Sequence, residues 1–268
     1  MKAIKVDNLT FGYVQNHKVL DDISFCIEDA SVNVLLGLNG SGKTTLIKLL
    51  AGLLKPNSGE ITVKDKAFNK LSPHERSKLI SYVAQRSGSV DDFTVRAYLL
   101  FGSINQFKFY ERPKREHEDK ANIYAERFGI SKLLDKNLGQ LSGGERQIVS
   151  ICAAMIQDSP IVILDEPTSA LDISNQHRVL KLLREIAQVE NKTFVLSTHN
   201  PNHALYLDAN VILLKNGKIA NQGTAKQLIT VDNLKSIYGN ELCLSKDLPY
   251  KEISFMDKVE PNSKEGEK

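Results

Sequence analysis

The 268-residue sequence has no tryptophan, only three methionines and three cysteines, and no long apolar run. No stretch approaches the roughly 18 consecutive apolar residues that a membrane-spanning helix needs. The first eight residues, Met-Lys-Ala-Ile-Lys-Val-Asp-Asn, contain no apolar signal core. The sequence therefore predicts a soluble, intracellular chain.

An excess of charge of one sign is also lacking, because 35 basic and 32 acidic residues leave a net charge of +3. This balance does not favour a nucleic-acid partner. The three cysteines, Cys26, Cys152 and Cys243, lie far apart and none forms a CxxC pair. We expect them to be small buried hydrophobic residues in a reducing compartment, rather than metal ligands or disulfide partners.

Short strand-like runs alternate with helix-like segments along most of the chain. Strands are expected at 4–9, 24–27, 32–36, 60–63, 79–83, 161–164, 194–197, 211–214 and 218–220, the last two joined by a tight turn at Asn216-Gly217. Helices are expected at 44–54, at 141–154 and around 179–186, and 91–140 reads as a mostly helical insertion with a solvated loop over its charged stretch, 111–120. Such alternation predicts an α/β fold with parallel strands. The polar tail from about residue 245 is expected to fray.

A glycine-rich loop follows the expected strand at 32–36. Its sequence, Gly37-Leu-Asn-Gly-Ser-Gly-Lys-Thr44, fits GxxxxGK[ST], and a helix is expected to follow it. Glycines let the backbone turn tightly and aim N–H groups at phosphate oxygens, and the helix start adds unsatisfied donors. Lys43 can then reach the β- and γ-phosphates, and the Thr44 hydroxyl can ligate Mg²⁺. The alternative is a glycine-rich turn without a ligand. The expected strand before the loop and the expected helix after it favour the phosphate-binding interpretation. The predicted ATP-binding residues here are Asn39, Gly40, Ser41, Gly42, Lys43, Thr44 and Thr45.

Two adjacent carboxylates end another apolar strand, in Ile161-Val-Ile-Leu-Asp165-Glu166. Ligands of parallel sheets bind at the carboxyl ends of the strands, so this position suits catalysis. Asp165 is the candidate Mg²⁺ residue, acting largely through coordinated water. Glu166 is the candidate general base for the attacking water. Taken alone, an Asp-Glu pair after a strand is often a solvated turn, and the upstream glycine loop is what favours the catalytic interpretation.

A third motif, Leu141-Ser-Gly-Gly-Glu-Arg-Gln147, opens an expected helix and suggests a second anion-binding helix start. Together the motifs resemble the nucleotide-binding domains of ABC ATPases, for which LSGGE followed by Arg-Gln is highly specific. The resemblance covers roughly residues 4–239. It implies that ATP held by the glycine loop of one subunit also meets Ser142, Gly143 and Gly144 of a second copy. It also implies a P-loop NTPase (RecA-like) core with an N-terminal antiparallel β subdomain and an inserted helical subdomain.

Other positions match the family residue by residue. Gln85 resembles the Q-loop glutamine, which implies contact with Mg²⁺ or the lytic water and a loop that meets the permease. His199 resembles the switch histidine at the γ-phosphate, Asp172 belongs to a segment like the D-loop, and Tyr13 fits the aromatic residue that stacks on adenine. Two departures are minor: Asn39 stands where proline is common, and Thr44 where serine is common. Neither removes a needed group.

The resemblance further implies a domain at 1–240, with the helical subdomain at about 91–157, and a short C-terminal extension at 241–268. The segments Leu71–Gln85 and Phe93–Gly102 are similar to those of importers for iron–siderophores, haem and cobalamin. We therefore expect an ATPase subunit of an importer, working as an ATP-dependent homodimer with Mg²⁺ on a separate permease dimer, and indirectly with an extracytoplasmic binding protein. It would lie at the cytoplasmic face of a prokaryotic membrane. A soluble non-transport ABC ATPase and an exporter subunit are the alternatives, and the cargo, whether metal chelate, cobalamin or oxyanion, is left open.

Overall fold

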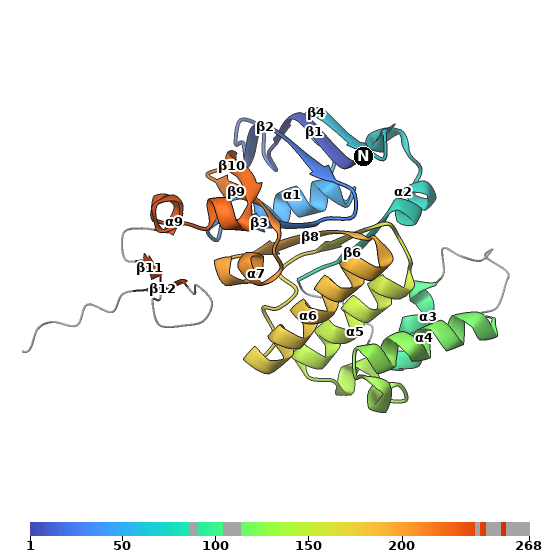
Figure 1. The fold of residues 1–268 in the computed structure, drawn as a ribbon. Coiled ribbons are helices and arrows are strands. Elements are labelled where there is room, and N and C mark those ends of the chain that lie inside the picture. Colours follow the sequence, from blue (N-terminus) through green and yellow to red (C-terminus); the bar gives the residue numbers. More distant parts are fainter. Residues whose placement is uncertain (86–90, 104–113, 239–241, 245–252, 256–268) are drawn as a thin grey trace, which may run out of the picture.

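The computed structural model describes residues 1–85, 91–103, 114–238, 242–244 and 253–255 (Figure 1). The tail that was expected to fray from about residue 245 lies mostly outside these ranges. Within it, β12 (Ile253–Phe255) pairs as an antiparallel strand with β11 (Leu242–Leu244), which directly precedes the tail. Among the described residues, no helix is both long and apolar enough to cross a membrane.

A six-stranded sheet forms the centre of the molecule, in the order β10-β9-β3-β8-β7-β6. Its strands are β3 (Val32–Leu36), β6 (Ile80–Val83), β7 (Ile161–Leu164), β8 (Thr193–Thr198), β9 (Asn210–Lys215) and β10 (Lys218–Thr224). The strands from β9 to β6 run parallel, whereas β10 pairs antiparallel with β9. The predicted hairpin joins these last two, and Asn216 and Gly217 both adopt positive φ angles, 50° and 74°.

A smaller antiparallel sheet lies above the central one, in the order β2-β1-β4-β5 (Figure 1). Its strands are β1 (Lys2–Phe11), β2 (Leu20–Glu28), β4 (Ser58–Val63) and β5 (Lys66–Ala67). Buried and exposed residues largely alternate along β2, as expected for a strand with one face on a core. The N-terminal antiparallel subdomain of the expected fold is therefore present.

The helices cover both faces of the central sheet. They are α1 (Lys43–Leu50), α2 (Pro73–Leu79), α3 (Val95–Gly102), α4 (Arg115–Arg127), α5 (Gly143–Ile156), α6 (Ile173–Glu190), α7 (Pro201–Tyr206), α8 (Ala225–Leu228) and α9 (Val231–Tyr238). Short 3₁₀ turns occur at Phe68–Lys70, Ser131–Leu133 and Leu138–Gln140. Helix α1 lies between the two sheets, and α3, α4, α5 and α6 lie on the opposite side of the central sheet (Figure 1).

Two hydrophobic cores result, one on each face of the central sheet. In β3, Val34 and Leu36 belong to the core beneath α5 and α6, whereas Leu35 belongs to the core shared with α1 and the small sheet. This follows from the two-residue period of a strand, which sends successive side chains to opposite faces. Because both faces are covered, the strand is apolar at each of these positions.

Three expectations from the sequence need correction. Helix α1 ends at Leu50 rather than at residue 54, because the chain turns at Gly52 with a φ of 73°. The charged stretch expected to be a loop is helical from Arg115 onward, since α4 exposes its charges and buries a separate face. Cys26 is half-buried rather than buried, whereas Cys152 is buried as expected; Cys243 lies in β11, where side chains are outside the described part.

Helix α2 was not predicted, although its start carries a clear signal. Ser72 caps the helix by accepting a hydrogen bond from the backbone N–H of Glu75, and the Glu75 carboxylate accepts one from the Ser72 N–H. Pro73 occupies the first turn, where its missing N–H has no cost. The helix buries no side chain, so hydrophobic periodicity could not reveal it.

Candidate active site

The carboxyl ends of four parallel strands carry the candidate residues. The glycine loop follows β3, Gln85 follows β6, Asp165 and Glu166 follow β7, and His199 follows β8. Because β3, β8, β7 and β6 are neighbours in the sheet, these segments meet at one edge. This is where ligands of open parallel sheets bind.

The glycine loop has a backbone that side chains would strain. Gly40 and Gly42 have φ angles of 80° and 105°, in the left-handed region that favours glycine. At Gly37 the restriction is space, because an added Cβ would lie 2.3 Å from the Leu214 carbonyl oxygen. The loop leads into α1, so backbone N–H groups at a helix start face the same region.

Lys43 supplies the positive charge of the site. Its Nζ donates hydrogen bonds to the carbonyl oxygens of Gly37 (2.9 Å) and Leu38 (3.0 Å), and the side chain is largely buried. Burial lowers the pKa of Lys43, while the nearby charges of Glu166 and Asp165 oppose that shift. A partly desolvated ammonium group interacts strongly with anions that reach it, because screening by water is weak there.

Asp165 is the buried carboxylate, only 1% exposed. Its Oδ1 accepts a hydrogen bond from the Ser197 hydroxyl at 2.6 Å and one from the Thr44 hydroxyl at 3.3 Å. Carboxylate and hydroxyl oxygens are the ligands that Mg²⁺ prefers, so Thr44 and Asp165 fit a magnesium site. In the described ranges no cluster of three or more His, Cys, Asp or Glu side chains could hold a metal ion.

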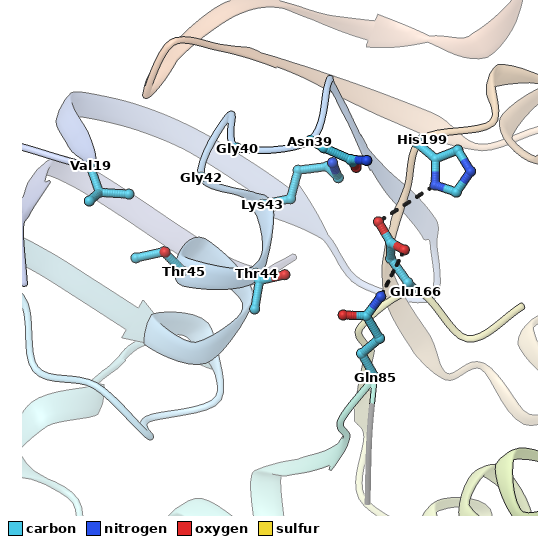
Figure 2. Close-up of a pocket in the computed structure, with 10 residues that line it drawn as sticks. All are labelled: Val19, Asn39, Gly40, Gly42, Lys43, Thr44, Thr45, Gln85, Glu166 and His199. Carbon is cyan, nitrogen blue, oxygen red and sulfur yellow. Dashed lines mark hydrogen bonds and ion pairs between the residues drawn. The ribbon is translucent and has the colours of Figure 1, made fainter. Parts of the chain in front are cut away.

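Glu166 lies beside Asp165, and its side chain extends toward Gln85 and His199. Its backbone has a φ of 46°, in the left-handed region, and its N–H donates to the Ser197 hydroxyl at 2.9 Å. Its Oε2 accepts a hydrogen bond from Gln85 Nε2 at 3.1 Å, and its Oε1 lies 3.6 Å from His199 Nδ1. Figure 2 shows the three side chains converging from three different strand ends.

These residues surround one pocket of about 450 Å³. Its lining residues are Val19, Asn39, Gly40, Gly42, Lys43, Thr44, Thr45, Gln85, Glu166 and His199 (Figure 2). All but Val19, which precedes β2, are residues that the sequence motifs or the resemblance selected. Ser41 is buried behind the loop instead, and its hydroxyl has no hydrogen-bond partner in the part of the chain that is described. The dimensions of the pocket suit a ligand of nucleotide size.

Tyr13, the candidate adenine-stacking residue, is not among the lining residues but reaches one of them. Its hydroxyl lies 3.2 Å from the Thr45 hydroxyl, and its ring packs edge-on against Phe11 with centroids 5.0 Å apart. Since 59% of its surface is exposed, the ring has a free face beside the pocket.

The other predicted ATP contacts do not line this pocket. Ser142 is exposed and caps α5, where it exchanges two hydrogen bonds with Glu145. Gly143 is exposed and Gly144 half-buried in the first turn of the same helix. Asp172 caps α6 by accepting a hydrogen bond from the Asn175 N–H at 2.8 Å. Within one chain, the two candidate phosphate sites, the glycine loop and the start of α5, therefore do not line the same pocket.

The family model described as "ABC transporter" matches residues 20–169, which is more than half of the chain and includes the glycine loop, Gln85, Asp165 and Glu166. The chain belongs to the ABC transporter family. As an ABC transporter ATP-binding protein it is an ATPase coupled to transport, and its fold is that of the P-loop NTPases. The fold and family expected from the sequence are thus confirmed.

Three curated relatives are ABC transporter proteins of nearly the same length. An uncharacterized ABC transporter ATP-binding protein of Haemophilus influenzae is 37% identical over 88% of this chain and 89% of its own. A probable iron chelatin transport ATP-binding protein of Helicobacter pylori is 35% identical over 90% of this chain and 94% of its own. The molybdate import ATP-binding protein MolC of H. influenzae is 31% identical over 95% and 94%.

Two solved structures are similar to this ABC transporter ATPase along most of its length. A proposed metal-chelate type ABC transporter in an inward-facing conformation aligns with a TM-score of 0.81 at 28% identity, covering 96% of this chain and 99% of the other. MJ0796, a bacterial ABC transporter cassette solved as a dimer, aligns with a TM-score of 0.76 at 26% identity, covering 83% and 98%.

One residue with close contacts to the candidate catalytic pair was missed in the sequence. Ser197 bonds both Asp165 and Glu166, yet it lies inside the expected strand at 194–197, and of the segment Leu196-Ser-Thr-His199 only His199 was selected. A hydroxyl in an otherwise apolar buried strand was the available signal, because buried polar groups need partners.

Proposed function

We propose that this chain is the ATP-hydrolysing subunit of a binding-protein-dependent importer, in which ATP binding and hydrolysis by a homodimer drive uptake through a separate permease. The observation that carries the proposal is the convergence of Lys43, Glu166, Gln85 and His199 on one pocket. These groups supply a cation for phosphates, a carboxylate for water and two side chains that orient them.

The phosphate end of ATP is assigned to the glycine loop. Backbone N–H groups between Asn39 and Thr45 would hold the β- and γ-phosphates, with Lys43 as the cationic partner. Tyr13 would stack on the adenine, since its exposed ring lies next to Thr45. Phosphoryl transfer needs positioning and charge stabilisation more than covalent help from the protein, and this arrangement provides both.

Mg²⁺ is the metal that fits best between Thr44 and Asp165, with Gln85 as a further oxygen ligand. When bound, Mg²⁺ neutralises charge on the β- and γ-phosphates. The chain's own part is to keep the Thr44 hydroxyl and the Asp165 carboxylate adjacent, as their 3.3 Å contact allows.

Glu166 is assigned as the general base. A carboxylate within hydrogen-bond reach of a water beside the γ-phosphate can accept its proton, a contribution of typically 10²- to 10⁴-fold. The Gln85 amide and the His199 ring flank the carboxylate, at 3.1 Å and 3.6 Å, so they can fix its direction and contact the transferred phosphoryl group.

A second copy of the chain would complete each ATP site. Ser142, Gly143, Gly144 and Asp172 lie outside the pocket and on exposed helix starts, so they are free to face the γ-phosphate held by a partner. A helix start is a natural anion site, which gives these exposed positions a function in a dimer. The solved dimer of a similar cassette supports this arrangement.

The proposed cargo is a metal chelate, such as an iron–siderophore or haem, with cobalamin or an oxyanion as other members of the same importer class. Relatives named for iron chelatin and for molybdate, and a similar proposed metal-chelate transporter, support this class. The permease and an extracytoplasmic binding protein would select the cargo, and the ATPase would lie at the cytoplasmic face of a prokaryotic membrane.

The ATPase domain is proposed to span residues 1–240, with 91–157 as its helical subdomain and 241–268 as a C-terminal extension.

The test compares Glu166→Gln with the wild type by size-exclusion chromatography, with and without Mg·ATP. The substitution keeps the size of the side chain but removes the base, so it should trap ATP in a closed dimer and lower the ATPase rate at least 100-fold. Lys43→Ala is the control for nucleotide binding and should stay monomeric with ATP. Undiminished hydrolysis by Glu166→Gln would contradict the proposed mechanism.

The transport part has its own measurement. The tagged chain, expressed in its own host, should pull down a membrane permease. The purified chain should also bind vesicles that contain this permease. Fractionation with ribosomes or DNA and never with membranes would support the non-transport alternative. Capture of an exporter-type membrane protein instead would leave the ATPase mechanism intact and overturn the importer assignment.

A further inference from the structure

Ser197 occupies a buried position between the two carboxylates of the site. It lies near the end of β8, with a relative exposure of 0%, and β8 is the strand directly beside β7 in the sheet. Its hydroxyl donates to Asp165 Oδ1 at 2.6 Å and accepts from the Glu166 N–H at 2.9 Å. A single oxygen atom thus contacts consecutive residues that are assigned different tasks.

We infer that Ser197 is a positioning residue that sets the direction of both Asp165 and Glu166. This inference rests on the proposed roles of those two residues as the Mg²⁺ carboxylate and the general base. Ser197 itself lines no part of the nucleotide pocket, so it acts through its neighbours and not on the substrate.

The first task concerns the Asp165 carboxylate. A carboxylate can rotate about its terminal bond, and that rotation is broad when nothing restrains it. The donor from Ser197 and the second donor from Thr44 both meet Oδ1, so the group has a fixed orientation toward the start of α1. Partners of this kind orient metal-binding residues, and their loss typically costs about 10- to 100-fold in metal affinity or activity.

The second task concerns the backbone of Glu166. A non-glycine residue with a φ of 46° is in a disfavoured region and keeps that conformation only when its surroundings demand it. The hydrogen bond from its N–H to Ser197 is one such restraint, and the bonds from the Ser169 hydroxyl and N–H to the Glu166 carbonyl oxygen are another. This turn directs the Glu166 side chain toward Gln85 and His199, whereas the Asp165 carboxylate faces Thr44 and Ser197.

The pair of bonds explains why a hydroxyl is needed here. Serine can donate one hydrogen bond and accept another through the same oxygen, which alanine cannot do and which a carboxylate or an ammonium group could not do in this pattern. Removing the hydroxyl would leave the part-buried N–H of Glu166 without its acceptor and the buried Asp165 carboxylate with one donor fewer.

Ser197→Ala tests the inference, with Ser81→Ala as the matched control. Ser81 is also fully buried in the central sheet, in β6, and its hydroxyl has no hydrogen-bond partner among the described residues. Three quantities are measured for each variant: affinity for a fluorescent ATP analogue in EDTA, the Mg²⁺ concentration that gives half-maximal ATPase activity, and kcat. The thermal unfolding midpoint checks that each variant folds.

For Ser197→Ala we expect metal-free nucleotide affinity within about two-fold of the wild type, and a half-maximal Mg²⁺ concentration and a kcat each changed about ten-fold or more. Ser81→Ala should match the wild type in all three. Ser197→Thr keeps the hydroxyl and should restore most of the Mg²⁺ dependence. If Ser197→Ala does not fold, Ser197→Cys, which keeps a weak donor of similar size, takes its place and should show the same pattern.

Two results would overturn the inference. One is a Ser197→Ala enzyme with wild-type Mg²⁺ dependence and kcat. The other is equal loss of metal-free and metal-dependent nucleotide binding, which would indicate a purely structural role. Either result, combined with an inactive Glu166→Gln enzyme, leaves the proposed function standing, whereas an active Glu166→Gln enzyme would remove the basis of both.

Discussion

The Tyr238 hydroxyl donates a hydrogen bond to the backbone carbonyl oxygen of His199, with the two oxygens 3.0 Å apart. Tyr238 is the last residue of α9, whereas His199 follows β8 at the edge of the active site. The bond joins the C-terminal helix to the loop that carries the candidate switch histidine. Burial raises the pKa of Tyr238, so the phenol stays protonated and can donate this hydrogen bond throughout the working pH range.

Tyr238→Phe should therefore affect catalysis as well as stability. We expect the free energy of unfolding to fall by about 1 kcal/mol, the usual worth of one such bond. We also expect kcat to fall a few-fold with KM for ATP unchanged, because His199 loses a constraint on its main chain. Tyr206→Phe is the control, since the Tyr206 ring packs against His177 in a T-shaped contact that phenylalanine would keep. Equal kcat values for the two variants would contradict a role for the bond in catalysis.

His203 predicts a pH-dependent stability. Burial first, and the nearby His199 second, lower the pKa of His203 from 6.5 to about 4. The neutral ring bonds Thr198 through Nδ1 (3.1 Å) and Asn200 through Nε2 (3.3 Å). At a pH between these two pKa values, the unfolded chain binds more protons than the folded one. The free energy of unfolding should therefore fall as the pH drops from about 6.5 to 4, by at most about 1.4 kcal/mol per pH unit.

Urea denaturation at a series of pH values measures this effect. His203→Gln cannot take up the proton, so its stability should depend less steeply on pH over that range. His74→Gln alters an exposed histidine at the surface of α2 and should keep the wild-type slope. Parallel slopes for wild type and His203→Gln would contradict the assignment.

Glu190 should be a strong link between α4 and the end of α6. Its carboxylate accepts hydrogen bonds from the Tyr124 hydroxyl (2.9 Å) and from Arg127 Nη1 (2.8 Å). Glu190→Ala would leave the Tyr124 hydroxyl, on a side chain only 7% exposed, without this partner, and should destabilise the protein by about 2 kcal/mol. Glu185→Ala breaks an exposed ion pair with Lys181 and removes a charge that acts on Arg127 without a hydrogen bond, so it should cost less than about 0.5 kcal/mol. Similar urea midpoints for the two variants would contradict this.

Mixing two inactive variants tests whether each ATP site is shared. Lys43→Ala removes the cation of the glycine loop, and Ser142→Asp adds a negative charge at the start of α5 while keeping a good helix cap. Each variant alone should hydrolyse ATP poorly. In a mixed dimer the intact loop of one chain faces the intact Ser142 of the other, so activity should return, to at most about a quarter of the wild-type rate for random pairing. No recovery in the mixture would contradict shared sites.

The sequence predicted the site better than its surroundings. Lys43, Glu166, Gln85 and His199 were chosen from motifs and from the family resemblance, and they line one pocket because each follows a parallel strand of the same sheet. Strand order did not have to be known, since all such ends lie at one edge. The contacts assigned to Ser142 and Asp172 need a second chain and stay predictions.

Local signals explain most of the differences. Helix α2 buries no side chain, so apolar periodicity could not reveal it, although the Ser72–Glu75 capping box could have done so. The last turn predicted for α1 is absent because Gly52 ends the helix with a positive φ. Ser197 escaped notice because its contacts with Asp165 and Glu166 depend on β7 being the neighbour of β8. A single sequence does not reveal the order of strands in the sheet.

The parallel strands β3, β6, β7, β8 and β9 of the central sheet each contribute side chains to both hydrophobic cores. In β7, Ile161 and Ile163 belong to the core around α1, and Val162 and Leu164 to the core beneath α5 and α6. Unfolding of the elements that cover either core would expose one whole face of these strands to water. Neither core should therefore come apart while the other persists. The domain should lose its structure in one cooperative step, with its slowest amide hydrogen exchange in β3, β7 and β8.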